Sequence, residues 1–180
     1  VDQVRPGGMI AVVTSSYTMD KNTSKFREYI AQRCDLVGAV RLPNNAFADT
    51  KTVSDILFLQ KRENQTVVYP YWTQTGRTAD GLRVNAYFAR HPEMVLGKVV
   101  KSTRYGDDSE TIDVIADTEK TLSEQLAAAV SKLHANIPEK IFNAVKIGGS
   151  DKKTSETIPA DPYVRNFTYT IIDGEVYYRE

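Results

Sequence analysis

Three short apolar runs in the first third of the chain predict three β-strands. They cover residues 9–13, 36–42 and 53–60. The first run, Met-Ile-Ala-Val-Val, has no polar position, which is typical of a strand buried on both faces in an α/β sheet. Between the first two strands, Phe26, Tyr29, Ile30 and Cys34 recur at helical spacing. This spacing predicts an amphipathic helix over residues 23–34 that packs on the sheet.

Beyond residue 62 the pattern becomes that of a small α+β tail. Asn85 is placed to begin a short helical turn, and residues 98–116 alternate as a strand, a turn and a strand. Thr121-Leu-Ser-Glu124 has the form of a capping box, so a helix is predicted over residues 121–135. The chain closes with apolar alternation on both sides of Asp173-Gly174, which predicts a terminal β-hairpin.

These patterns divide the chain into a first region that carries the sheet and three segments that come after it. We expect β-like runs near Val67 in the second region and a second short helix after Pro138 in the third. The predicted organisation is residues 1–62 as a partial core, 63–117 as a β-rich extension, 118–146 as a helical segment and 147–180 as a linker with the hairpin.

Composition adds mainly exclusions. The chain has 180 residues and a formal net charge of +0, which is ordinary for a soluble domain and gives no overall basic character for nucleic-acid binding. The single cysteine excludes an internal disulfide and a cysteine-based zinc site. His91 and His134 have no nearby ligand partners, so no metal site is predicted. No signal peptide and no run of about 20 apolar residues occur, and we expect a cytoplasmic protein without membrane contact.

Four stretches of the first region stand in a characteristic order and spacing. They resemble the part of gamma-type adenine-specific DNA methyltransferases that lies after their catalytic Asn-Pro-Pro-aromatic motif. The matching stretches are RPGGMIAVVTSS (5–16), KFREYI (25–30), VGAVRLPNNAF (37–47) and TVSDILFLQKR (52–62). In the tail, NAYFARHPEMVLG (85–97) and DGEVYYRE (173–180) resemble large proteins of phages and conjugative elements, which join such a methyltransferase segment to a superfamily 2 helicase segment.

The resemblance implies a fold, and it implies which functional motifs would lie outside this sequence. Class I, Rossmann-like methyltransferases have the strand order 3-2-1-4-5-7-6, with strand 7 antiparallel. Residues 9–13, 36–42 and 53–60 would then be strands 5, 6 and 7, the C-terminal half of that sheet. The glycine-rich loop for S-adenosylmethionine and the Asn-Pro-Pro-aromatic motif are both absent from this sequence. We therefore expect a fragment with no catalytic residue and no cofactor of its own, whereas the intact parent would bind S-adenosylmethionine.

Phe47 is the main candidate binding residue. Adenine methyltransferases take the target base out of the DNA stack and hold it by aromatic stacking. In the similar enzymes a phenylalanine in the loop before strand 7 stacks on the flipped adenine, and Phe47 occupies the matching position. The alternative is that Phe47 only plugs the edge of the sheet.

Further candidates come from strand ends and basic positions. Thr14, Ser15 and Ser16 come directly after the first strand, where α/β sheets place their ligands, so they would line a pocket or else cap the next helix. A second set of candidates would contact the DNA backbone or, alternatively, be solvated surface charges. These basic candidates are Arg41, Lys98, Lys101 and Arg104.

Three interpretations remain open at this point. The chain is part of an adenine-specific DNA methyltransferase, a non-catalytic scaffold module that positions DNA or a helicase segment of the same protein, or a generic Rossmann-like fragment with no nucleic-acid role. In the methyltransferase half-fold strand 4 is missing beside residues 9–13, which leaves an exposed sheet edge. We expect this edge either to pair with a second copy as a homodimer or to be covered by the tail.

Overall fold

The computed structural model describes residues 1, 3–104, 110–133, 168–172 and 175–179. The chain divides into two units, Val1–Phe142 and Asn143–Glu180, and each is considered by itself. The fold is mixed α/β. No helix in the described part is long and apolar enough to cross a membrane.

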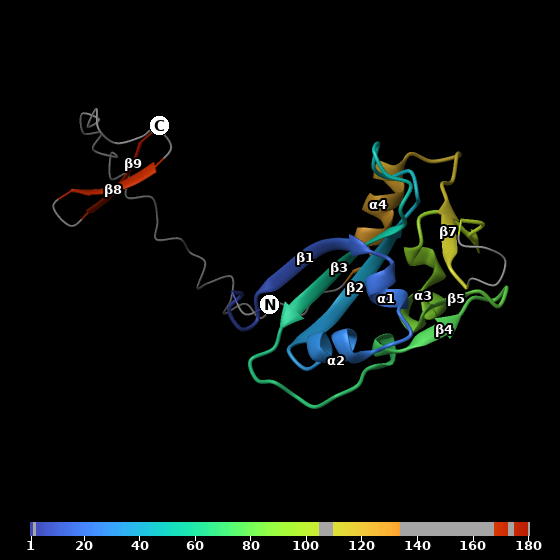
Figure 1. Cartoon of the computed structure of the whole chain (residues 1–180), viewed down its shortest axis with the longest axis horizontal. Helices are drawn as coiled ribbons and strands as arrows, with labels where there is room; N and C mark the ends of the chain where they lie inside the picture. Colours follow the sequence, from blue (N-terminus) through green and yellow to red (C-terminus); the bar gives the residue numbers. More distant parts are fainter. Residues whose placement is uncertain (2, 105–109, 134–167, 173–174, 180) are drawn as a thin grey trace. The chain divides into compact units, whose positions relative to one another are not determined.

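A three-stranded sheet organises the first unit. Its strands are β1 (Met9–Ser15), β2 (Cys34–Leu42) and β3 (Ser54–Lys61). Their order is β1-β3-β2, so the last strand in sequence lies between the other two (Figure 1). β3 is antiparallel to both neighbours, and β1 and β2 therefore run parallel to each other. All three predicted strands are confirmed.

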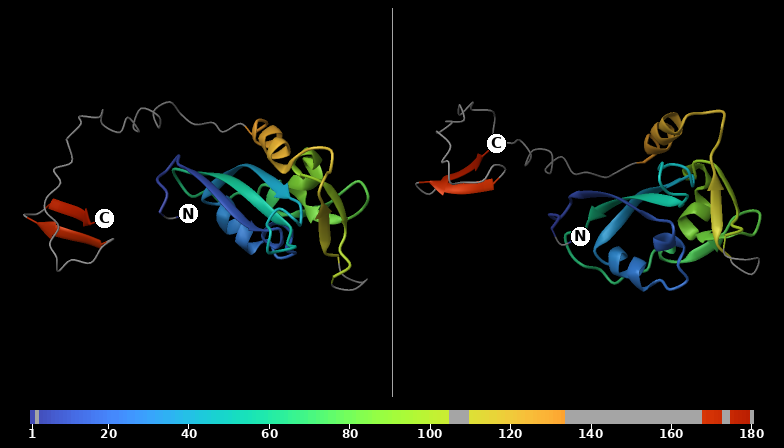
Figure 2. Two further views of the ribbon diagram at one scale, coloured as in Figure 1. Left: turned by 90° about the horizontal axis from the view of Figure 1, so that it is seen from above. Right: turned by 45° about the horizontal axis from the view of Figure 1, so that its top comes forward.

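Helices lie on both sides of this sheet. α1 (Tyr17–Asp20) and α2 (Lys25–Ala31) connect β1 to β2, and α4 (Leu122–Val130) lies on the opposite side of the sheet from α2 (Figure 2). α4 begins at Thr121, whose hydroxyl accepts from the Glu124 amide, while the Glu124 carboxylate accepts from the Thr121 amide. The predicted capping box and its helix are confirmed, although the helix ends at Val130.

The predicted face of α2 is wrong. Phe26 and Tyr29 are 57% and 43% exposed, whereas Arg27 and Ala31 are buried. Arg27 is held inside because its guanidinium donates from Nε to the Thr73 carbonyl at 2.7 Å and from Nη1 to the Thr18 carbonyl at 3.3 Å. Burial lowers the pKa of Arg27. The helix is also shorter than predicted, because Cys34 already belongs to β2.

The extension, residues 63–117, is a series of short elements. Asn85 caps its longest helix by accepting from the Tyr87 amide at 2.8 Å, as predicted. The two strands predicted within 98–116 also form, whereas the turn predicted at Tyr105-Gly106 lies outside the described residues. The β-like run near Val67 is not a strand. The elements are η1 (Tyr71–Thr73), β4 (Thr75–Arg77), β5 (Arg83–Asn85), α3 (Ala86–Arg90), η2 (Pro92–Met94), β6 (Lys98–Lys101) and β7 (Ile112–Ile115).

This extension closes the β2 side of the sheet. Leu96 donates its amide to the Arg41 carbonyl at 2.8 Å, and Asn44 donates to the Val114 carbonyl at 2.9 Å. Val84, Phe88 and many other extension residues belong to the same buried apolar cluster as β2 and β3. The partial core and the extension therefore fold as one body, within the unit Val1–Phe142.

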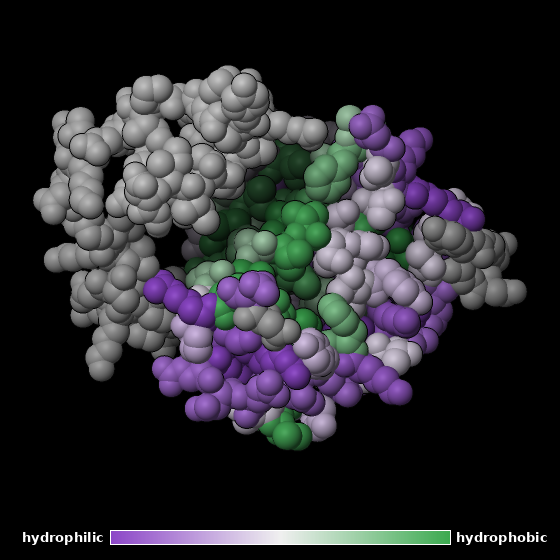
Figure 3. Space-filling view, turned by 60° about the vertical axis from the view of Figure 1, so that its left-hand side comes forward, coloured by the Kyte–Doolittle hydropathy of each residue, from purple (hydrophilic) through white to green (hydrophobic). Residues whose placement is uncertain are grey.

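The β1 side is open instead. The expectation that residues 9–13 are buried on both faces is wrong, because Val12 and Val13 point to opposite faces and are 41% and 54% exposed. β1 pairs only with β3 among the described strands. Seen from the left-hand side of Figure 1, an area of apolar side chains lies among hydrophilic ones (Figure 3). The predicted exposed edge is confirmed, and its pairing with a second copy stays a prediction.

The second unit contains the predicted terminal hairpin. β8 (Thr168–Ile172) and β9 (Glu175–Arg179) pair antiparallel, with Ile172 opposite Glu175. The Asp-Gly turn itself, the helix predicted after Pro138 and the linker lie outside the described residues.

Candidate functional site

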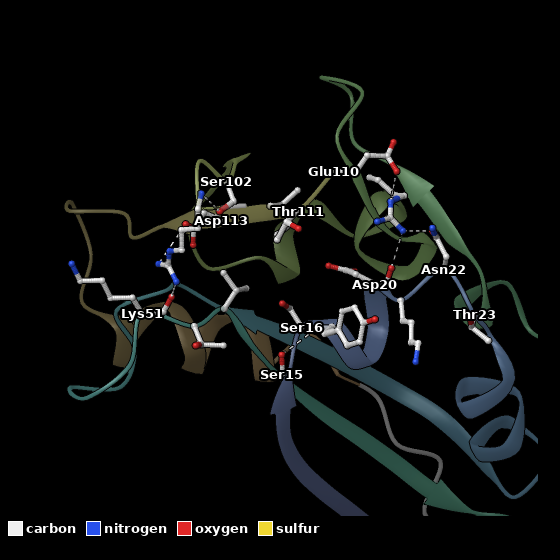
Figure 4. A pocket seen from close by; sticks show the side chains of 17 residues that line it. Ser15, Ser16, Asp20, Asn22, Thr23, Lys51, Ser102, Glu110, Thr111 and Asp113 are labelled. Atoms are coloured by element: carbon white, nitrogen blue, oxygen red, sulfur yellow. Dashed lines mark hydrogen bonds and ion pairs between the residues drawn. The ribbon is translucent and has the colours of Figure 1, made fainter. Parts of the chain in front are cut away.

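The main pocket of the described residues lies at the carboxyl end of β1, with a volume of about 520 Å³. Residues of both regions line it (Figure 4). The first region contributes the end of β1, α1 with the turn after it, and the segment before β3. The extension contributes Arg83, residues that follow β6, and residues at the start of β7. A pocket of this size can hold a drug-sized molecule, for which about 300–1,000 Å³ is usual.

The three predicted hydroxyl residues, Thr14, Ser15 and Ser16, do not all lie in this pocket. Ser15 and Ser16 line the pocket, but Thr14 does not and instead shares a 2.7 Å hydrogen bond with the Thr18 hydroxyl. Ser16 is the N-cap of α1, although its side chain makes no capping hydrogen bond. Both serines therefore line the pocket, and neither caps α2, the helix that the sequence analysis expected after them.

Phe47 lies in the loop between β2 and β3 and is 44% exposed. Part of the residue is therefore accessible to solvent. A short bridge joins Phe47 to Thr50 and folds the loop back on itself. It is not among the residues that line the pocket, but Lys51 and Thr52 of the same loop are. Its role with adenine stays a prediction.

Arg41 cannot contact DNA in this structure, and the prediction for it is wrong. The residue is completely buried. Its Nε and Nη2 donate to the two carboxylate oxygens of Asp55 at 2.8 and 2.9 Å. Its Nη1 forms an ion pair with Asp20 at 2.9 Å, and its guanidinium lies 4.2 Å from the centre of the Phe88 ring.

This cluster joins the two regions, and its member Asp20 also lines the pocket. Asp20 also accepts from the Asn85 amide at 2.7 Å, and the Asn85 side chain donates to the carbonyls of Met19 and Trp72. Burial alone would lower the pKa of Arg41, but Asp55 and Asp20 raise it well above its ordinary value. Burial raises the pKa of Asp55, and Arg41 opposes that effect. The Arg41 guanidinium is paired with Asp55 and Asp20 within the protein, so we interpret the cluster as structural.

The remaining basic candidates have different positions. Lys98 and Lys101 are exposed on β6 and do not line the pocket. Arg104 does line it, donates to the Lys51 carbonyl, and lies 3.5 Å from the Asp113 carboxylate. The structure therefore brings Arg104 to the serines at the end of β1, and leaves both lysines apart from them.

Among the pocket residues, the sequence analysis named as candidates only Ser15, Ser16 and Arg104. Arg83 and Glu110 are two of those that it missed. Arg83 forms a 2.8 Å ion pair with Glu110 and donates to the Asp20 carbonyl at 3.2 Å and to the Asn22 side chain. Glu110 also pairs with Arg77 at 3.1 Å. No local motif marks these residues, since they come together only when the extension folds against the first region.

The described residues contain no group of three or more His, Cys, Asp or Glu side chains that could hold a metal ion. Cys34 is a buried free thiol, and burial raises its pKa. Neither feature adds a catalytic group to the pocket.

Comparison with known proteins gives no assignment. No family model matches the chain, and no curated protein matches it.

Proposed function

We propose that this chain supplies the downstream half of an adenine-specific DNA methyltransferase core, including one wall of the pocket that holds the target adenine. The arrangement of the three-stranded sheet carries this proposal. A strand order of 5-7-6 with strand 7 antiparallel is what the resemblance implies, and β1-β3-β2 has that order and those directions.

The positions of the candidate residues support the same reading. In open α/β sheets, ligands bind beyond the carboxyl ends of the parallel strands. Ser15 ends β1, and the loop with Phe47 comes after β2, which is parallel to β1. Both segments therefore lie at the same edge of the sheet. An exposed aromatic ring at this edge suits a base that has left the DNA stack.

The open side of β1 fits the missing half. A strand of seven uncharged residues with exposed valines and an unpaired outer edge is the surface expected beside an absent neighbouring strand. In this proposal strand 4 of the same methyltransferase core would pair there. That strand would lead into the Asn-Pro-Pro-aromatic motif, which this sequence does not contain.

The residues present do not fit a cofactor site for S-adenosylmethionine. The sequence has no Gly-x-Gly and no Pro-Pro pair, so neither the cofactor loop nor the catalytic motif can be placed on it. We assign no chemical step to this chain. Its part would be to complete the sheet and to hold the base through Phe47. In calorimetric titration, the chain by itself should show no binding of S-adenosylmethionine.

The test is adenine-methylation mapping in cells that express the protein containing this chain. Phe47→Ala should abolish most methylation, and Phe47→Tyr should restore it, because a tyrosine ring can also stack. The matched control is Phe26→Ala, which removes another exposed phenylalanine from α2. Methylation that is unchanged in Phe47→Ala would remove Phe47 from the base pocket. If the unsubstituted protein leaves adenine unmethylated, the methyltransferase proposal is overturned.

A further inference from the structure

The pocket between β1 and β7 has chemistry that the stacking role of Phe47 does not use. Figure 4 places Glu110 and Asp113 toward opposite ends of the pocket, with Thr111 between them and Ser15 and Ser16 across from it. Each acidic residue has an arginine partner, Arg83 for Glu110 and Arg104 for Asp113. The pocket is thus a slot with an arginine–carboxylate pair toward each end and hydroxyl groups between. The charged side chains of Asp20, Lys21 and Lys51 also line it.

The carboxylate partner of each arginine is one that a ligand phosphate can replace. Arg83, whose side chain is 22% exposed, also donates to the Asp20 carbonyl and the Asn22 side chain, and Arg104 also donates to the Lys51 carbonyl. The side chain of Arg104 is 38% exposed, and its 3.5 Å pair with Asp113 is long. Glu110 is 50% exposed and is shared between Arg83 and Arg77, so one carboxylate serves two guanidinium groups. Partly exposed ion pairs contribute only about 0–1 kcal/mol, whereas guanidinium binds phosphate oxygens through paired, charge-assisted hydrogen bonds.

An aromatic ring completes the slot. Tyr17 lines it beside Ser16 and is 64% exposed. The Lys21 ammonium lies 5.5 Å from the centre of its ring. Basic groups along a groove together with an exposed aromatic ring are the features that bind unpaired nucleic-acid strands, in which each base can stack on a ring.

We propose that this slot binds an unpaired stretch of DNA strand, with phosphates at Arg83 and Arg104 and one base on Tyr17. A strand has a phosphate on either side of each nucleoside, which matches a guanidinium at each end of the slot, whereas a mononucleotide has phosphate on one side only. A duplex, with its bases already stacked in pairs, would leave Tyr17 unused.

The proposed slot adds a DNA-strand contact to the proposed methyltransferase function, and it rests on that function. Lys51 and Thr52 line the slot and belong to the same loop as Phe47, so a strand in the slot would lead directly to a base held by Phe47. The extension would therefore provide a second contact to the strand that carries the target adenine. Arg83, Arg104 and Tyr17 are positioning residues in this proposal, because none of them meets the reacting amine.

The experiment measures binding of the 180-residue chain to a labelled single-stranded DNA of about a dozen nucleotides by fluorescence anisotropy at several salt concentrations. Tyr17→Ala should weaken binding about tenfold, the effect of losing one stacked base. Arg104→Gln should also reduce the slope of log affinity against log salt by about 0.7, as expected for one lost phosphate contact.

Two variants serve as matched controls. Tyr29→Ala removes another exposed tyrosine, and Lys132→Gln removes an exposed basic residue outside the slot. Both should bind like the unsubstituted chain, and circular dichroism should show that all four variants keep the same fold. Equal losses in the controls, no binding at low salt, or equal affinity for dAMP and the oligonucleotide would each overturn the proposal.

The outcomes separate this proposal from the function on which it rests. Slot-dependent DNA binding without adenine methylation in cells would overturn the methyltransferase proposal and keep the slot. Adenine methylation that depends on Phe47, together with DNA binding that is indifferent to Tyr17 and Arg104, would keep the methyltransferase proposal and overturn the slot.

Discussion

The two outer strands of the sheet differ in how completely the chain encloses them. Residues 38–42 of β2 are all buried, and successive side chains point to opposite faces, so both faces of the strand are covered. β1 pairs with the same central strand, yet Val12 and Val13 are exposed on its two faces. The described residues of the first unit therefore complete one side of the sheet and leave the other as an apolar edge.

The difference arises because later segments of the chain pack against only one of these strands. The extension returns to β2 through the Leu96 amide and the buried cluster around Arg41, and α4 packs against the same strand. No described element of the first unit returns to β1 on its outer side. The incomplete side is the one where the proposed methyltransferase core needs its missing half.

The largest expected effect comes from breaking the charged cluster on the closed side. Arg41→Leu leaves Asp55 and Asp20 in the interior without their counter-charge, which should lower the free energy of unfolding by about 3–5 kcal/mol. Urea unfolding followed by circular dichroism measures this loss. The control is Asp35→Asn, which removes the partner of the partly exposed Arg62 and should cost under about 1 kcal/mol. A similar small cost for Arg41→Leu would mean that the cluster does not join the two regions.

A second pair of variants compares the outer strands directly. Val40→Ala, at a position with 0% exposure on β2, removes two buried methyl groups and should cost roughly 2–3 kcal/mol. Val13→Ala, at 54% exposure on β1, should change the free energy of unfolding by under about 0.5 kcal/mol. Thermal and urea unfolding of both variants gives the comparison. Equal costs would show that β1 is covered in solution, either by a second copy or by the tail.

A third prediction concerns alkaline pH on the closed side. Burial raises the pKa of Tyr87, against a hydrogen bond with the backbone of Ala39 in β2. The folded state therefore holds this proton more tightly than the unfolded state does. The contribution is complete below the ordinary tyrosine pKa of 10.0 and is lost as the pH rises through the higher folded value.

The measurement is the free energy of unfolding at several pH values between neutrality and strongly alkaline conditions. Tyr87→Phe should show a smaller loss of stability at alkaline pH than the unsubstituted chain. Tyr69→Phe, which changes a tyrosine that is 59% exposed, should leave the pH dependence unchanged. If both variants and the unsubstituted chain give one curve, the Tyr87 hydroxyl does not link stability to pH.

The closed side also shows where sequence patterns stop being informative. Local signals were sufficient for the three strands, the Asn85 cap and the capping box at Thr121, because each depends on neighbouring residues. Burial of Arg41 and Arg27 was not predictable, since arginine usually marks a surface and their partners are distant in sequence. Asp55 lies 14 positions from Arg41, and Thr73 lies 46 positions from Arg27.

Some residues of the candidate site could also be predicted from the sequence, and others could not. The sequence placed Ser15 and Ser16 at the end of a strand, and the structure finds a pocket there. α1 was missed because its four residues are too few to show a helical period. Arg83 and Glu110 could not be paired from the sequence, because only the packing of the extension against the first region brings them together.

The smallest expected effect concerns the helix that covers β2. Thr121→Ala removes the hydroxyl that accepts from the Glu124 amide and should cost about 1 kcal/mol. Ser123→Ala, an exposed change within the same helix, is the control and should have little effect. Hydrogen exchange gives the more informative reading, because loss of the cap should first increase opening of α4 and of residues near Gly38, where the Leu133 side chain packs closely against β2. Exchange that rises equally along β1 would show that α4 stabilises the whole sheet rather than its closed side.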